Sequence, residues 1–517
     1  MLRGEIEKLI KDIVKKDVHL EHPANLEFGD FSTNVAMQTK IDPQKIISKL
    51  KDNQLFEKIE VVGPARPHRY AKRSGQGFIN FFLSKNALTE EVSEILSKRD
   101  DYGSLDVGQD KKVQVEFISA NPTGPLTVGN ARGGPLGDVL ANILNKAGFK
   151  CEKAFYVNDA GMQILTLGHS VLKDDQAKYQ GEYIDQLNKK IKEKDPFKAG
   201  QLAAKHIIKD LIQKTTDKLG VKYDEWIFES DLHQLKKVDQ ALSFLKKKGL
   251  IYEKDEAEWF KSKQFGDERD RVMIKKDGNN TYLAGDIALH RYKFEDKKFD
   301  QVINIWGADH HGDVPGLMAG VEAIGHKDKL KVILLQFVTI LDKGEKQKMS
   351  KRAGLYVEMD ELLDKVGPDA VRFFFLQKSA DTHLNFDLAL AQEQSAKNPV
   401  YYIQYAHARI CSILRKAELK GNNKDLDSLN HPTELNLIRQ LIKFPEMIED
   451  IARDYQVQRL PYYSLELAHS FHKFYEQCRV LDKDKKIAQA RINLVKTTQI
   501  ILKNTLGLMG INAPEKM

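Results

Sequence analysis

Two short loops, far apart along the chain, contain residue types that can bind phosphate groups. The first, residues 121–130, reads Asn-Pro-Thr-Gly-Pro-Leu-Thr-Val-Gly-Asn and is called the phosphate loop below. Its glycines, Gly124 and Gly129, allow close backbone approach, and Thr127 and Asn130 offer short side-chain donors. Unpaired N–H groups at the start of the helix-like stretch that follows would favour an anion. For an isolated loop of this kind, helix capping by Thr127 or Asn130 is an equally good interpretation.

The second loop, residues 342–354, is strongly basic and is called the lysine loop below. Its centre reads Lys-Met-Ser-Lys (348–351), and five of the eleven residues 342–352 are basic. Such a run is usually a solvated surface loop. Because this one follows an apolar strand-like stretch and contains Gly344 and Gly354, we expect it to lie at the mouth of a sheet. Its cations could there neutralise a departing pyrophosphate.

These loops, with other stretches in the same order, resemble the signatures of the arginyl-tRNA synthetase family of class I aminoacyl-tRNA synthetases. The matching stretches are residues 28–34, 77–80, 119–133, 307–312, 348–351, 367–373, 381–387 and 398–409. The likeness covers nearly the whole chain, and its motifs are highly specific. It implies that arginine is activated with ATP, accompanied by Mg²⁺, and is then transferred to its tRNA.

The resemblance also implies which residues bind the nucleotide. ATP would be bound by Pro122, Thr123, Gly124, Pro125, Thr127, Gly129, Asn130, Gly307, Asp309, Lys348, Met349, Ser350 and Lys351. Thr127, Asn130, Lys348 and Lys351 would be the catalytic residues. The chain departs from the family pattern at Thr127 and Asn130, which replace the two histidines of the HIGH signature. Neither can carry a charge, but both can donate hydrogen bonds to phosphate, so we expect the same type of chemistry.

The resemblance further implies an arginine pocket. It would consist of Glu116, Ser119, Asn121, Glu229, Tyr282, Asp286 and His310. A planar guanidinium requires matching acceptors, which Asp286 and Glu229 could supply, while Glu116 and Asn121 would hold the α-amino group. Tyr282 and Asp286 would share one face of a helix. Without the resemblance, each acidic residue would be interpreted as an ordinary surface charge.

Two other functions are compatible with the residues alone. A class I synthetase for another amino acid would share both loops, and lysine as its substrate would also suit an acidic pocket. A non-catalytic tRNA-binding paralogue would explain the missing histidines, although the intact lysine loop argues against it.

The loops must be positioned by an α/β domain. Alternating or apolar stretches predict strands at residues 113–117, 154–157, 301–306 and, as one long strand, 331–341. Residues 136–147 have a helical stripe that ends at Gly148. Strand, loop, helix and strand in this order predict a Rossmann-like, doubly wound parallel sheet.

This sheet would belong to the middle one of three domains. We expect a catalytic domain at residues 106–388, with a helical insertion at about 160–260. A small α+β domain at residues 1–105 would contact tRNA, and an all-α helical bundle at residues 389–517 would bind the anticodon. Within this bundle, Tyr401, Tyr405 and Arg409 could stack on unpaired bases.

Composition sets broader limits. The net charge of +7 and pI of about 8.8 permit RNA as a partner but do not establish one. The three cysteines have no paired spacing, so we expect no structural zinc, no other metal site and no disulfide framework. We find neither a bilayer-length apolar run nor a signal peptide, which predicts a cytoplasmic protein, and we expect a monomer.

Overall fold

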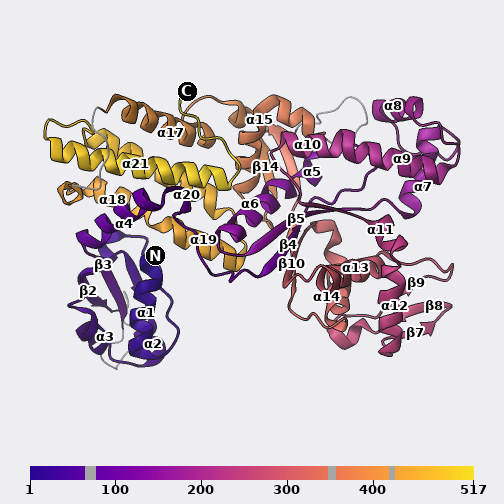
Figure 1. Cartoon of the computed structure of the whole chain (residues 1–517), viewed down its shortest axis with the longest axis horizontal. Helices are drawn as coiled ribbons and strands as arrows, with labels where there is room; N and C mark the ends of the chain where they lie inside the picture. The colour runs from indigo at the N-terminus through magenta and orange to yellow at the C-terminus, as the bar shows by residue number, and fades with distance from the viewer. Residues whose placement is uncertain (64–76, 347–356, 418–424) are drawn as a thin grey trace.

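The centre of the molecule is a five-stranded parallel sheet (Figure 1). The computed structural model describes residues 1–63, 77–346, 357–417 and 425–517. The sheet consists of β4 (Lys112–Glu116), β5 (Lys150–Val157), β6 (Glu225–Phe228), β10 (Gln301–Gly307) and β11 (Leu330–Leu335). The strand order is β11-β10-β4-β5-β6, and all neighbouring strands are parallel. The order reverses between β4 and β10, so the predicted doubly wound sheet is confirmed, with its ligand site expected beyond the carboxyl ends of these two strands.

Close packing against the sheet fixes the helix that follows the phosphate loop. Val115 in β4 and Ile303 in β10 are fully buried, as in a sheet covered on both faces. Helix α6 (Gly133–Lys146) packs against β5 and is followed by Gly148 at φ 88°, the predicted left-handed residue after its end. Gly137 permits the close approach, because a Cβ there would lie 2.2 Å from Cγ of Phe117.

The N-terminal α+β domain is built on a separate antiparallel sheet of order β1-β3-β2. Its strands are β1 (Phe31–Thr33), β2 (Phe56–Val62) and β3 (Phe78–Leu83), and its helices are α1 (Leu2–Val14), α2 (Val35–Thr39), α3 (Pro43–Leu50) and α4 (Lys85–Lys98). Ile6 and Ile10 of α1 are fully buried, so the amphipathic stripe of this helix forms part of the domain core.

The stretch expected to be a helical insertion contains both helices and strands. The helices are α7 (Gly161–Leu172), α8 (Glu182–Lys190), α9 (Pro196–Ile207), α10 (Gln213–Lys218), α11 (Glu229–Gln234) and α12 (Lys237–Lys247). However, β6 within it is an edge strand of the central sheet, and β7 (Ile251–Lys254) and β8 (Ala257–Phe260) form an antiparallel sheet with β9 (Arg271–Ile274). The expectation of a purely helical stretch is therefore wrong. Helices α13 (Tyr282–Arg291) and α14 (Val314–Ala323) complete this half of the domain.

The chain between residues 330 and 342 forms two strands in two different sheets. Strand β12 (Val338–Asp342) leaves the central sheet and pairs with β13 (Glu345–Lys346) and β14 (Leu384–Asp387). The prediction of one strand over residues 331–341 is therefore wrong. The break occurs because buried Arg132 donates hydrogen bonds to the carbonyl oxygens of Gln336 and Phe337.

The C-terminal part of the chain is helical, as predicted. It consists of α15 (Met359–Leu376), α16 (Leu388–Gln392), α17 (Pro399–Lys416), α18 (Pro432–Leu441), α19 (Lys443–Asp454), α20 (Arg459–Gln477) and α21 (Lys485–Leu508). Figure 1 shows α17 to α21 gathered beside the central sheet, with the N-terminal domain adjoining them. In the described part of the chain, no helix combines the length and apolarity needed to cross a membrane.

A buried arginine joins three parts of this architecture. The Arg372 guanidinium in α15 forms an ion pair with Asp138 of α6. It also donates from Nε to the carbonyl of Met509 at 2.6 Å and from Nη1 to that of Leu219 at 3.1 Å. Both side chains of the ion pair are almost fully buried. The helical bundle is therefore fastened to the helix that carries the phosphate loop.

We predict that Arg372→Ala destabilises the protein by roughly 3–5 kcal/mol, because it leaves Asp138 and several carbonyl oxygens without this donor. Urea unfolding followed by circular dichroism measures the change. Arg459→Ala is the control, since its ion pair with Asp454 is exposed and should contribute less than about 1 kcal/mol. Equal losses in the two variants would contradict the joining role of Arg372.

Candidate active site

A strained turn at the end of β4 begins the candidate site. Ile118 and Ser119 both have positive φ, at 65° and 41°. Because non-glycine residues rarely adopt this conformation, the surrounding structure must hold them in it. The turn directs Ser119 Oγ to donate to Glu116 Oε1 at 3.2 Å and to accept from the backbone N–H of Tyr156 at 3.1 Å. It thereby fixes a hydroxyl and a carboxylate between β4 and β5.

Three acidic residues predicted for the pocket come together at this edge. Glu116 ends β4, Glu229 begins α11, and Asp286 lies one turn into α13. Glu229 lies against the glycine before Asp286, with Oε1 3.6 Å from the position that a Cβ would occupy at Gly285. Glu116 Oε2 accepts from the buried ammonium of Lys293 at 2.5 Å. No comparable ion pair with lysine or arginine is found for Glu229 or Asp286 among the described residues.

The electrostatics of this carboxylate cluster (Glu116, Glu229 and Asp286) favour an added cation. Burial, together with the carboxylates of Glu116 and Glu229, raises the pKa of Asp286 to about 8. Burial and the same group of acids also raise the pKa of Tyr156 well above its usual value. A bound cation would relieve the repulsion between the carboxylates and stabilise their ionised forms.

The layer beneath the cluster is neutral apart from Lys293. His290 is fully buried, and burial together with Lys293 lowers its pKa to about 3, so its ring carries no charge at neutral pH. Its Nδ1 bonds the carbonyl of Asp286 at 2.7 Å, and its Nε2 lies 2.9 Å from Asn304 Nδ2. Lys293 pairs with Glu116, and His233 Nε2 lies 3.7 Å from Glu229 Oε1, whereas the described residues give Asp286 no ion-pair partner.

The phosphate loop forms a short helix, α5 (Val128–Ala131), in front of α6. Thr127 caps it: Oγ1 accepts from the backbone N–H of Asn130 at 3.3 Å and donates to Asn130 Oδ1 at 2.6 Å. Capping is thus a real role of Thr127. The Asn130 side chain is exposed, and its Nδ2 has no hydrogen-bond partner in the described part of the chain, so this group is available to a ligand.

Other parts of the chain hold the phosphate loop in place. Tyr183 of α8 donates from its hydroxyl to the carbonyl of Thr123 at 2.8 Å. The backbone N–H of Val128 donates to the carbonyl of Val357 at 2.9 Å, three residues after the end of the lysine loop. Lys348, Met349, Ser350 and Lys351 lie outside the described residues. The structure therefore describes one neighbour of the lysine loop but not its catalytic positions.

The remaining predicted ligands are more exposed. Tyr282 is 68% exposed, at the start of α13, and Asn121 is also exposed. His310 follows β10, with Nδ1 3.3 Å from Asp313 Oδ2. A Cβ at Gly307 would lie 2.4 Å from Oδ1 of Asp309, so this glycine makes room for the Asp309 carboxylate. Tyr282, Asn121, Asp309 and His310 are thus exposed and do not belong to the buried part of the site.

The predicted RNA-contacting residues form a stack on α17. The Tyr401 and Tyr405 rings are nearly parallel, with centroids 6.3 Å apart. The Arg409 guanidinium lies 4.7 Å from the Tyr405 ring centroid and 5.2 Å from that of Tyr475. The three predicted residues are half-buried, so each retains an accessible part.

Sequence reasoning missed Tyr156, Tyr183 and Lys293. Tyr156 and Lys293 reach the cluster through strand pairing and a helix turn, and Tyr183 reaches the phosphate loop from a separate helix. A lysine inside an otherwise amphipathic stretch gives no local signal that it neutralises a distant glutamate. Among the described residues, no group of three or more His, Cys, Asp and Glu side chains is arranged to hold a metal ion.

We predict that Asp286→Asn raises the unfolding temperature of the ligand-free protein more at pH 8.5 than at pH 5. With the folded-state pKa raised to about 8, the stability associated with protonated Asp286 is fully present only below the unfolded-state pKa of about 3.9. It is lost as pH rises from there through the folded-state pKa, by at most about 1.4 kcal/mol per pH unit. Thermal unfolding at both pH values measures this, with the exposed Asp309→Asn as control. The same difference between wild type and Asp286→Asn at both pH values would contradict a raised pKa.

Comparisons with known proteins agree with this geometry. Family models match as follows: Arginyl tRNA synthetase N terminal domain at residues 1–65, tRNA synthetases class I (R), catalytic domain at 91–195 and 182–411, and DALR anticodon binding domain at 403–517. An Arginine–tRNA ligase of Bacillus licheniformis is 43% identical, covering 97% of this chain and 94% of its own. One from Heliobacterium modesticaldum is 42% identical, with 96% and 93% covered.

A solved structure extends the likeness to the fold. The Thermus thermophilus arginyl-tRNA synthetase has a TM-score of 0.79, is 23% identical and matches 100% of both chains. The family models and the curated relatives span all three parts of the chain in the same order. The chain therefore belongs to the arginyl-tRNA synthetase family of class I aminoacyl-tRNA synthetases.

Proposed function

We propose that this arginine–tRNA ligase binds the guanidinium of arginine at Asp286 and Glu229. The observation that carries the proposal is the carboxylate cluster, in which only Glu116 has a buried ammonium partner among the described residues. Burial, with the added repulsion of Glu116 and Glu229, raises the pKa of Asp286 to about 8. A guanidinium would supply the missing charge and, unlike an ammonium, a planar set of donors that can match two carboxylates.

The reaction then has two steps. An oxygen of the arginine carboxylate attacks the α-phosphorus of ATP, the bond to the β,γ-diphosphate breaks, and pyrophosphate leaves with the bonding electrons. A hydroxyl at the 3′ end of tRNA(Arg) next attacks the arginyl carbonyl carbon, and AMP leaves. Neither step needs a protein nucleophile, so positioning and electrostatic stabilisation provide the catalysis.

We assign the ATP phosphates to the phosphate loop and the lysine loop. The free Nδ2 of Asn130 would donate to a phosphate oxygen, with Thr127 holding this side chain in place. Lys348 and Lys351 would stabilise the leaving pyrophosphate, and Gly307 and Asp309 would border the nucleoside. Mg²⁺ would arrive with ATP, bound mainly by its phosphates, and no structural zinc is assigned.

The rest of the arginine is assigned to the strained turn and the pocket mouth. Glu116 and Asn121 would hold the α-amino group, with Ser119 orienting Glu116. Lys293 neutralises one side of Glu116 and leaves the buried glutamate able to accept a further donor. Tyr282 and His310 would border the bound amino acid at the mouth.

The same proposal assigns the RNA contacts. Tyr401, Tyr405 and Arg409 would stack on unpaired anticodon bases, because their ring faces and guanidinium lie in one column on α17. We propose that the enzyme acts as a monomer in the cytoplasm. Family membership decides against the two alternatives, a synthetase for another cationic amino acid and a non-catalytic paralogue.

We predict that Asp286→Asn and Glu229→Gln each raise KM for arginine by ~10²-fold and change KM for ATP by less than about threefold, because each removes a charge-assisted contact to the guanidinium. Aminoacylation kinetics with total tRNA measure both constants. Lysine and the neutral isostere citrulline should be poor substrates for the wild-type enzyme. The Asp231→Asn variant is the control for loss of one exposed carboxylate near the site, because Asp231 lies two residues after Glu229 and is assigned no ligand. Equal effects of Asp286→Asn on both constants would remove Asp286 from the amino-acid pocket.

We predict that Asn130→Ala lowers the rate of arginyl-adenylate formation by about tenfold, because one donor to phosphate is lost. Asn130→His should retain activity, since a ring nitrogen can replace the amide donor. Single-turnover adenylate formation, measured in the presence of tRNA, distinguishes this effect from a change in tRNA release. If Asn130→Ala is as active as the wild type, the residue serves the helix cap alone.

A further inference from the structure

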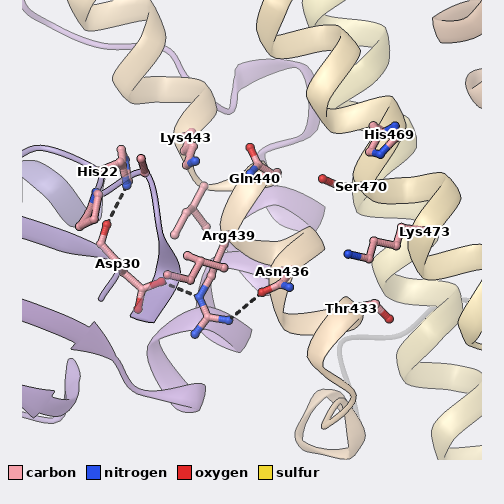
Figure 2. Close-up of a pocket in the computed structure, with 14 residues that line it drawn as sticks. His22, Asp30, Thr433, Asn436, Arg439, Gln440, Lys443, His469, Ser470 and Lys473 are labelled. Carbon is pink, nitrogen blue, oxygen red and sulfur yellow. Dashed lines mark hydrogen bonds and ion pairs between the residues drawn. The ribbon is translucent and has the colours of Figure 1, made fainter. Parts of the chain in front are cut away.

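A cavity lies between the N-terminal domain and the helical bundle. It shares no lining residue with the candidate active site. Its volume is about 310 Å³. Figure 2 shows the N-terminal side chains of His22 and Asp30 on one side and side chains of the helical bundle on the other. The volume is at the lower end of small-molecule pockets, which suits one nucleotide better than a long segment of a macromolecule.

Three cationic side chains surround this interdomain cavity. Arg439 of α18 is held by Asp30, to which Nε donates at 2.5 Å, while Nη1 donates to Asn436 at 3.4 Å. Lys443 at the start of α19 and Lys473 of α20 have no ion-pair partner in the described ranges. Figure 2 shows Lys473 extending toward Asn436. The cavity therefore has more positive charge than its own carboxylate, Asp30, balances.

The cavity also contains a polar atom that needs a donor. Oε1 of Gln440 is buried and has no hydrogen-bond partner among the residues that the structure describes. A buried acceptor without a partner is costly unless a ligand or water satisfies it. Ser470 and His469 add further polar groups, and Leu26, which is 48% exposed, adds an apolar surface against which a base could pack.

We infer that the interdomain cavity binds one nucleotide unit of RNA. Its phosphate would lie near Lys443, Lys473 and the free edge of Arg439, and an amino or hydroxyl group of its base or ribose would donate to Gln440 Oε1. Cations, a buried acceptor and an apolar surface in one cavity match the three parts of a nucleotide. The inference rests on the proposed function, in which tRNA is the substrate. A free nucleotide has the same chemistry as a nucleotide of RNA, and the two are distinguished by comparing tRNA binding with the binding of a free nucleotide.

The test is tRNA binding by the full chain with Lys443→Gln and Lys473→Gln combined. Neither lysine forms an ion pair with any residue in the described ranges, so this variant should fold normally. We expect about tenfold weaker binding near 0.15 M salt, and a slope of log K against log salt that is smaller by about 1. The control is Lys45→Gln with Lys49→Gln, two exposed lysines on α3 that make the same change in charge.

A second variant tests the acceptor. Gln440→Met should stabilise the free protein, because the unpaired buried oxygen is removed, and should also weaken tRNA binding severalfold. A merely structural glutamine would not produce opposite changes in stability and binding. The expected pair of effects supports the cavity as a ligand site. Unchanged tRNA binding by Gln440→Met would overturn the role of Gln440.

Calorimetry with uridine monophosphate tests whether the cavity binds a free nucleotide instead of a nucleotide of RNA. Uridine monophosphate binding that is lost in the double lysine variant, with tRNA binding unchanged, would assign the cavity to a free nucleotide and overturn the RNA source. If neither ligand is affected, the nucleotide inference is overturned. The turnover number at saturating tRNA should be normal in both variants. This separates the inference from the proposed function, which would fail only if the wild-type enzyme did not charge tRNA with arginine.

Discussion

Three carboxylates lie at the carboxyl edge of a parallel sheet, and among the described residues a buried ammonium pairs with one of them, Glu116. The rest of the site is organised around the negative charge that this ammonium does not balance. Glu116 has Lys293 as its partner, whereas burial and the neighbouring acids raise the pKa of Asp286 to about 8. Groups with strongly shifted pKa values cluster at functional sites, so the repulsion among these carboxylates indicates a ligand that relieves it. A cationic substrate would relieve the repulsion among these carboxylates, and the same carboxylates would select it over neutral amino acids.

The fold maintains this arrangement by fixing the elements that converge on the edge. The switch in strand order places β4 beside β10, and the strained turn after β4 holds Ser119 against Glu116. Two buried arginines then fasten more distant parts of the chain. Arg132 joins the end of the phosphate loop to the start of β12, and Arg372 joins α6 to the C-terminal end of the helical bundle. Both can do so because a guanidinium has several donors for backbone carbonyls.

Much of this fold could be predicted from sequence, because strands β4, β5 and β10 and helix α6 have clear periodicity. Strand β6 was missed because four residues, Glu225–Phe228, are too few to show a pattern within a helical stretch. The break at Gln336 and Phe337 was missed because its cause, Arg132, lies 204 residues away from the first of them. The acids of the pocket were identified only through family resemblance. The ion pair between Lys293 and Glu116 joins residues 177 positions apart in the sequence.

The central claim is that Asp286 and Glu229 together bind the guanidinium of arginine. A crystal structure of the enzyme with arginine bound tests this most directly. The account predicts guanidinium nitrogens within about 3.2 Å of carboxylate oxygens of both residues. A guanidinium bound elsewhere, with neither Asp286 nor Glu229 within hydrogen-bond distance of it, would contradict the account.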